Sequence, residues 1–271
     1  MAEKNYDDVS PVELAPGVFH LGVQDKRNSW ANIPYLVVEG DEAALIDPGS
    51  AKPEFYSVVL QKLHRVINPK KVRYLVVQHQ DPDLCAALPI FEKLAHPDVQ
   101  IIAPLEASIL VQHYGCSHSI TPVDDGDEIT IGGSRTLTFA MIPYVHFAGT
   151  MVSYDQKTKT VFSSDAFGGF TTSSDIYANE DYPELLGTFL GQYLGSKRAL
   201  EYAVARIRKL QSTEGVDRIC PQHGCVLPGD AVDAYLDAAG KLDVGGEVDR
   251  LAAKHSIELM WQETRLEKEG K

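Results

Sequence analysis

Hydrophobic residues in the first part of the chain fall in short runs separated by turn residues. Residues 35–38 and 43–46 are two such runs, and the Gly40-Asp41-Glu42 turn between them predicts a β-hairpin. After Pro53 the period changes, because apolar residues recur at every fourth position, as on one face of a helix: Phe55, Val59, Leu63 and Ile67. The pattern therefore predicts a hairpin followed by an amphipathic helix.

Strand-like and helix-like segments then alternate. A β-rich run at 72–77 is short enough for a buried strand, and a helix-like stretch follows at 86–94. Residues 99–102 and 105–111 repeat the same strand–helix order. This half of the chain therefore predicts strands with helices packed beside them.

The middle of the chain has antiparallel β character, with three short apolar runs: residues 137–141, 151–154 and 160–163. A long helical segment over about 183–210, a strand at 216–220 and a helix from near Asp230 complete the pattern. The order βαβα–βββ–αβα fits a layered α/β architecture in one domain. We expect this domain to cover residues 1–245, and the charged C-terminal tail 246–271 to form a peripheral helix.

The 271-residue chain is acidic, with 25 Lys and Arg against 38 Asp and Glu and a formal net charge of −13. Such a charge disfavours binding to nucleic acid backbones or an anionic membrane surface. No apolar run approaches the ~18 residues of a membrane span, and the N-terminus lacks the basic-then-apolar order of a signal peptide. Four cysteines without a CxxC pair argue against a disulfide scaffold. We therefore expect a soluble, cytoplasmic protein that binds neither nucleic acid nor membrane.

Histidine and aspartate residues follow the ends of four predicted strands. They are His79, Asp81, Asp83, His146, Asp165 and His223. Loops from the carboxyl ends of strands converge in α/β folds, and ligands collect there. Taken singly, each residue has an ordinary interpretation as a helix cap or a turn residue. Their joint placement favours a metal site, and three imidazoles with three carboxylates suffice for two ions with one carboxylate bridging.

These segments resemble the metal motifs of the metallo-β-lactamase fold. The resembling segments are His79-x-Asp81-x-Asp83, then His146, Asp165 in Ser-Ser-Asp-Ala-Phe-Gly, and His223 in Pro-Gln-His-Gly. Within that superfamily they are most similar to the di-iron domain of flavodiiron proteins and to stand-alone oxygen-binding di-iron proteins. The resemblance spans roughly residues 15–230. It implies a four-layer αββα sandwich with a dinuclear site at one rim.

The resemblance also implies roles for individual residues. One metal would be held by His79, Asp81 and His146, the other by Asp83 and His223, with Asp165 bridging, so that Asp81 and Asp165 would carry the chemistry. Asp47, in Leu-Ile-Asp-Pro-Gly, would support the metal loop from behind. Tyr193 is a candidate hydrogen-bond donor to a bound oxygen species, although a tyrosine on a helix is more often a core residue.

The ligand set distinguishes two branches of the superfamily. Its hydrolases carry His where this chain carries Asp81, and a carboxylate is a hard donor that moves the preference from zinc toward iron or manganese. Three carboxylates also stabilise the oxidised state of an iron pair. We therefore expect two iron ions, with manganese or zinc as alternatives, and a function in binding, sensing or reducing O2 or NO.

Two positions depart from the family pattern. The family usually has Glu where Asp81 stands, and usually has His where Leu84 stands, which leaves the second metal few protein ligands. Cys85 and Cys225 lie beside the ligand loops, and we expect both to be small buried residues. These departures keep two alternatives open: a binuclear hydrolase, acting on a phosphodiester or thioester through a bridging hydroxide, and an interaction protein with a degenerate site.

Flavodiiron proteins carry a flavodoxin-like domain after the di-iron domain. This chain ends about 48 residues after His223, so we expect no FMN in it. Repeated reduction of O2 or NO would then need a separate electron-donor protein. A homodimer is expected from the same resemblance.

Overall fold

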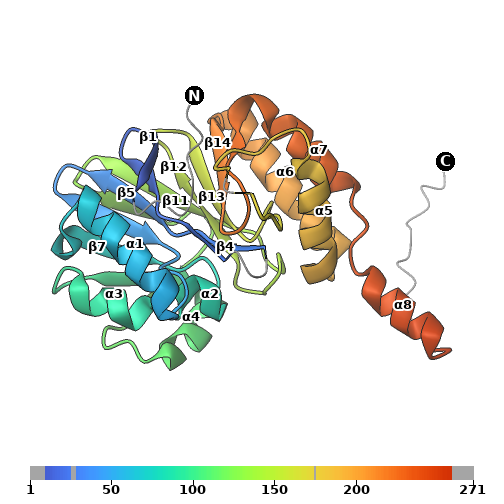
Figure 1. Ribbon diagram of the computed structural model, residues 1–271, viewed down its shortest axis with the longest axis horizontal. Helices are drawn as coiled ribbons and strands as arrows, with labels where there is room; N and C mark the ends of the chain where they lie inside the picture. The colour runs from blue at the N-terminus through green and yellow to red at the C-terminus, as the bar shows by residue number, and fades with distance from the viewer. Residues whose placement is uncertain (1–9, 26–28, 174, 258–271) are drawn as a thin grey trace.

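The computed structural model describes residues 10–25, 29–173 and 175–257 (Figure 1). Within these residues, one sheet has the strand order β1-β2-β5-β6-β7-β8-β9. Its strands are β1 Val12–Ala15, β2 Val18–His20, β5 Tyr35–Glu39, β6 Glu42–Ile46, β7 Val72–Val76, β8 Gln100–Pro104 and β9 Ile120–Val123. The expected hairpin is confirmed, because β5 and β6 pair antiparallel, whereas β6 to β9 run parallel.

A second sheet has the order β10-β11-β12-β13-β14-β15. Its strands are β10 Glu128–Ile131, β11 Arg135–Met141, β12 Met151–Asp155, β13 Thr160–Ser164, β14 Arg218–Pro221 and β15 Leu227–Pro228. The pair β13 and β14 is parallel, and β11 runs in the same direction as β13 because each is antiparallel to β12. The carboxyl ends of β11, β13 and β14 therefore meet at one edge of this sheet. A short ribbon of β3 Val23–Asp25 and β4 Trp30–Asn32 completes the β structure of the described residues.

Helices cover the outer faces of both sheets (Figure 1). On the first sheet lie α1 Pro53–Val66, α3 Leu88–Leu94 and α4 Leu105–Val111; on the second lie α5 Tyr182–Tyr193, α6 Lys197–Thr213 and α7 Val232–Lys241. The remaining helical elements are α2 Pro82–Cys85, α8 Gly246–Lys254 and the 3-10 turns η1 Pro69–Lys71, η2 Gln112–Tyr114 and η3 Gly229–Ala231. The expected four-layer αββα sandwich is confirmed.

Strand periodicity divides the core into three layers. In β5, Tyr35 and Val37 point between the two sheets, while Leu36 packs with α1 and α3 on the outer side. The third layer lies between the second sheet and its helices, where Val152 and Ile219 meet the apolar faces of α5, α6 and α7. Alternate side chains of one strand therefore serve two different cores.

One of the expected helices is broken into two. The segment expected as one helix over 183–210 is two helices, because Leu194 to Ser196 leave the helical path, and the Ser196 side chain accepts a hydrogen bond from the Ala199 amide to start α6. A serine at this position caps the first turn of the new helix. The stretch expected as a helix over 86–94 corresponds to α3, which begins at Leu88 and follows the separate short helix α2 Pro82–Cys85.

The tail begins with α8, which projects away from the body of the molecule (Figure 1). In this helix only Ala252 is buried, whereas Val248 and Leu251 are exposed. The rest of the predicted tail, residues 258–271, lies outside the described residues. Among those that the structure describes, no helix is long and apolar enough to cross a membrane.

Candidate metal centre

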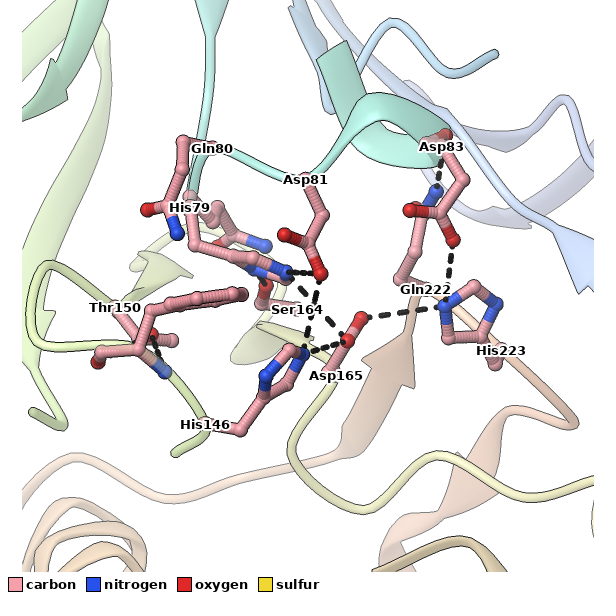
Figure 2. Close-up of polar contacts among 12 residues, drawn as sticks. His79, Gln80, Asp81, Asp83, His146, Thr150, Ser164, Asp165, Gln222 and His223 are labelled. Atoms are coloured by element: carbon pink, nitrogen blue, oxygen red, sulfur yellow. Dashed lines mark hydrogen bonds and ion pairs between the residues drawn. The ribbon is translucent and has the colours of Figure 1, made fainter. Parts of the chain in front are cut away.

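All six predicted donors lie at one rim of the sandwich, just beyond the ends of four strands (Figure 2). His79, Asp81 and Asp83 follow β7 of the first sheet. His146 follows β11, Asp165 follows β13 and His223 follows β14, so these three come from the second sheet. The site therefore lies where the two sheets meet.

Four of the six side chains form a tight group. Donor atoms of His79, Asp81, His146 and Asp165 all lie within 4.8 Å of one another. Oδ2 of Asp165 lies 3.0 Å from Nε2 of His146 and 3.5 Å from Nε2 of His79. Oδ2 of Asp81 faces the same two nitrogens at 3.3 and 3.5 Å. Two imidazoles and two carboxylates thus converge on one point.

The other two side chains form a second group on the far side of Asp165. Nε2 of His223 lies 3.3 Å from Oδ1 of Asp165 and 3.2 Å from Oδ2 of Asp83. Asp165 therefore presents one oxygen to each group, as Figure 2 shows. This is the placement that a bridging carboxylate requires.

The buried polar atoms of the site fit a bound cation. Nε2 of His79, Oδ1 of Asp165 and Nε2 of His223 are buried and form no hydrogen bond, although each faces oppositely charged atoms of the cluster at 3.2–3.5 Å. A buried polar atom without a hydrogen bond is costly and needs an explanation. All three atoms face the interior of the cluster, and carboxylate and imidazole are the donors that iron, manganese and zinc bind. The donor set of this chain therefore fits a metal site.

The carboxylates and imidazoles of the cluster shift one another's pKa values. Burial disfavours the charged form of His223, but the carboxylates of Asp165 and Asp83 outweigh it and raise the histidine pKa to about 10. For His146 the same competition between burial and the two carboxylates ends with a pKa raised to about 9. The pKa of Asp165 is held well below its usual range, since the charges of His79 and His223 overcome the effect of burial. In the metal-free cluster, protonated histidines beside ionised carboxylates thus stabilise the folded chain.

Other residues orient the imidazoles through their Nδ1 atoms. Nδ1 of His79 lies 2.6 Å from the Ser164 hydroxyl, and Nδ1 of His223 lies 2.6 Å from the Ala31 carbonyl oxygen. A partner at Nδ1 leaves Nε2 pointing into the site, which is the usual arrangement of a metal-binding histidine.

Asp47 lies behind the His79 loop. Its carboxylate accepts two hydrogen bonds from Gln78, one from the backbone amide and one from the side chain, each 2.9 Å long. Burial raises the pKa of Asp47 to about 7, against these hydrogen bonds. The contacts are those of a residue that holds the loop rather than of a direct donor.

Of the two departures from the family pattern, Asp81 is itself one of the converging donors, whereas Leu84 lies away from them. Leu84 is fully buried in the core beneath α2, among residues of the first sheet and its helices. Cys85 and Cys225 are buried free thiols, as expected; the Cys85 thiol donates to the Asp81 carbonyl, and burial raises the pKa of both. The Cys225 thiol donates to the Asp175 carbonyl, so both thiols point at backbone carbonyls and neither compensates for Leu84.

Tyr193 stands at the rim of the site, and its side chain is partly exposed. Its ring centroid is 5.9 Å from that of His146 and 5.2 Å from that of Phe189. Burial and the nearby carboxylates of the site raise the pKa of its hydroxyl. Tyr193 thus belongs to an aromatic wall beside the cluster, together with Trp30, Phe170 and Phe189.

Trp30 and Asn32 also support the site, and no sequence motif predicted this role. Nε1 of Trp30 donates to Oδ2 of Asp83 at 3.1 Å, and the Asn32 amide donates to the Asp83 backbone carbonyl. These residues precede Asp83 by about fifty positions and match no ligand spacing. The only signal in the sequence was their place before a predicted strand.

The fold and the cluster together define a metallo-β-lactamase-type sandwich with a histidine–carboxylate site at its rim. A family model described as ODP family beta lactamase matches residues 31–224, and the chain belongs to this family.

Two curated relatives and one solved structure place the family in context. Rubredoxin-oxygen oxidoreductase of Megalodesulfovibrio gigas is 26% identical over 213 residues, covering 75% of this chain and 52% of that protein. Anaerobic nitric oxide reductase flavorubredoxin of Aliivibrio fischeri is 26% identical over 228 residues, covering 82% and 45%. The chain thus spans about half the length of these relatives. A structure of the peroxy diiron species of the chemotaxis sensor ODP shares the fold, with a TM-score of 0.73 at 20% identity, covering 89% of this chain and 99% of that one.

Proposed function

We propose that this chain is a non-haem di-iron protein that binds, senses or reduces O2 or NO. The observation that carries the proposal is the Asp165 carboxylate, whose two oxygens face two separate groups of histidine and aspartate donors. The buried atoms of His79, Asp165 and His223 that form no hydrogen bond support it, because a pair of cations would satisfy all three. The names of the relatives, which refer to oxygen, nitric oxide and a diiron species, support the same choice of ligand.

We assign the donors to two positions. In the first, His79, Asp81 and His146 would hold one metal; in the second, Asp83 and His223 would hold the other, and Asp165 would offer one oxygen to each. Three carboxylates in one site are hard, anionic donors that favour iron or manganese over zinc. When bound, an iron pair supplies the electrons and open coordination positions that gas binding needs.

The chain's own residues would shape the space beside the metals. Trp30, Phe170, Phe189 and Tyr193 form an aromatic wall along one side of the cluster. The raised pKa of Tyr193 keeps its hydroxyl protonated, so that it can donate a hydrogen bond to a bound ligand. Asp47 would hold Gln78, and through it the backbone of the His79 loop, in place.

Sustained reduction of a gas requires electrons from outside the di-iron site. We propose that a separate electron-donor protein supplies them and that this chain binds no FMN of its own. We also propose that residues 1–245 form the di-iron domain, with 246–271 as an appended peripheral segment, and that the protein is a cytoplasmic homodimer.

An optical titration tests the function. The purified chain is loaded anaerobically with two equivalents of ferrous iron, and absorbance is recorded before and after air is admitted. We expect about two irons per chain and a new near-ultraviolet to visible band after mixing with air. Asp98→Asn, at a largely exposed carboxylate, is the matched control for Asp165→Asn, which should lose the band.

Two other results would redirect the assignment. Stoichiometric metal without any response to air would favour a binuclear hydrolase, to be tested with phosphodiester and thioester substrates. Failure to retain metal would indicate a degenerate interaction domain.

A further inference from the structure

The short strand β4 supplies three consecutive contacts to the second metal position. Nε1 of Trp30 donates to Oδ2 of Asp83 at 3.1 Å, and the carbonyl of Ala31 lies 2.6 Å from Nδ1 of His223. The side-chain amide of Asn32 donates to the backbone carbonyl of Asp83. Three adjacent residues thus position the two side chains that we assign to this metal.

Trp30 acts on both of these side chains at once. The carboxylate oxygen that accepts its N–H is the same Oδ2 that lies 3.2 Å from Nε2 of His223. Its indole also packs against the His223 imidazole, with ring centroids 4.3 Å apart. One side chain therefore fixes the direction of a carboxylate and the plane of an imidazole.

The second position depends on such support because it has few donors. Leu84, next to Asp83, points into the core and offers no ligand atom. Asp83 also borders a cavity of about 330 Å³, which the Lys52 side chain lines as well. Without the indole N–H, the carboxylate of Asp83 has space to turn toward this cavity and its cationic side chain.

We propose that Trp30 is a positioning residue that builds the second metal position by holding Asp83 and His223 in their binding geometry. The inference rests on the proposed two-metal site and names the residue on which its second half depends. Removing a side chain that orients a metal ligand lowers metal affinity about 10- to 100-fold. Trp30 should therefore control the second metal and leave the first nearly unaffected.

Anaerobic titration with Co²⁺ tests this without any turnover. The chain contains two tryptophans, so Trp261→Phe leaves Trp30 as the only indole. In this background we expect two binding steps by visible absorption, with Trp30 fluorescence quenched mainly in the weaker one. Trp30→Phe keeps an aromatic ring but lacks the donor, and should weaken that step about 10- to 100-fold. The stronger step should change less than about threefold.

Tyr154→Phe is the matched control, because it likewise keeps an aromatic ring and removes one hydrogen-bond donor, here the hydroxyl that donates to the Gly215 carbonyl at 2.9 Å. Gly215 precedes β14 whereas His223 follows it, so both metal-binding steps should stay within about threefold of the parent. Near-ultraviolet circular dichroism of each metal-free variant checks that it folds.

A double-mutant cycle separates positioning from packing. If Trp30 acts through Asp83, then Trp30→Phe should add almost nothing in an Asp83→Asn background. Three results would each overturn the inference while leaving the two-metal site intact. They are equal weakening of both metal-binding steps by Trp30→Phe, no change in the weaker step, and additive effects in the double-mutant cycle. A parent chain that binds one cobalt or none would instead overturn the proposed function, and this inference with it.

Discussion

The carboxylate of Asp165 and the imidazole of His223 face each other across the rim of the sandwich, with Oδ1 and Nε2 3.3 Å apart. Asp165 follows β13 and His223 follows β14, and the parallel pairing of these strands brings the two ends together. The other oxygen of Asp165 lies 3.0 Å from His146, which follows β11. One residue therefore links the two donor groups.

Asp165→Asn should disrupt both metal positions. An amide offers one neutral oxygen in place of two anionic ones, so the link between the groups loses a donor and a charge. We expect the metal content to fall from about two to at most one per chain, with about 100-fold weaker affinity for what remains. Elemental analysis after dialysis measures this, with Asp98→Asn as the control. Retention of two metals would show that Asp165 does not bridge.

Asp81→His should change the choice of metal. Oδ2 of Asp81 faces the imidazoles of His79 and His146 at 3.5 and 3.3 Å, and an imidazole in its place removes one negative charge from the site. We expect the variant to shift from iron toward zinc and to lose its response to air. Competitive loading from an equimolar mixture of ferrous iron and zinc gives the ratio. Oxygen reactivity that survives the substitution would rule out a redox role for Asp81.

The metal-free chain should lose stability as the pH rises. Since the pKa values of His146 and His223 are raised to about 9 and about 10, above the usual value of about 6.5, their contribution is complete below about pH 6.5 and disappears toward pH 10. Asp165 contributes with the opposite pH dependence. Because its pKa is lowered, the stability that it contributes is lost as the pH falls below about 4.

Bound metal should offset the loss of stability that the metal-free chain shows at alkaline pH. The same histidines must release their protons to bind a metal, so metal affinity rises with pH over that interval. Thermal unfolding at pH 5.5, 7.5 and 9.5, with a chelator and with added metal, compares the two forms. A chelated chain that unfolds at the same temperature at all three pH values would contradict this assignment of charge.

The buried Arg135–Asp155 pair should dominate the electrostatic part of stability. Arg135 donates to both carboxylate oxygens of Asp155 and, through Nη1, to the carbonyls of Pro16 and Val38 near the first sheet. Asp155→Ala leaves this buried guanidinium with the carboxylate of Glu39, 3.9 Å away, in place of the close pair, and loss of a buried partner costs about 3–5 kcal/mol. Lys71→Ala is the control, since Lys71 pairs with Asp41 on the surface, where such a pair contributes about 0–1 kcal/mol. Urea denaturation midpoints measure both, and similar losses would contradict the prediction.

Deleting residues 246–271 should leave the di-iron domain folded. Within the described part of this segment, Ala252 is the only buried residue of α8. Deletion therefore removes little buried apolar surface, which corresponds to a loss of about 1 kcal/mol or less in the free energy of unfolding. Chemical denaturation and metal analysis of the shortened chain test the boundary. Light scattering of both chains tests the proposed homodimer. A shortened chain that unfolds or loses its metals would show that the tail belongs to the domain.

The sequence alone determined the donor types and their placement at strand ends. His79, Asp165 and His223 each follow a short apolar run, and such runs are local signals that need no knowledge of distant contacts. The amphipathic helix at Phe55, Val59 and Leu63 and the hairpin before it were predictable for the same reason, and α1 and the β5–β6 pair confirm them. The break at Leu194 to Ser196 was missed although its serine cap is a local feature, because the apolar pattern continues on both sides.

The local pattern of the sequence did not decide how the donors divide; before the structure, only the family resemblance implied this division. The two oxygens of Asp165 separate them into two groups because strands of two different sheets end at one rim, and strand pairing between distant segments leaves no trace in local periodicity. The support of Asp83 by Trp30 and Asn32 joins segments about fifty residues apart. The direction of Leu84 was likewise set by the core beneath α2 rather than by its place beside Asp83. Local sequence determines which donor groups are present, whereas tertiary packing decides which of them lie close enough to form one site.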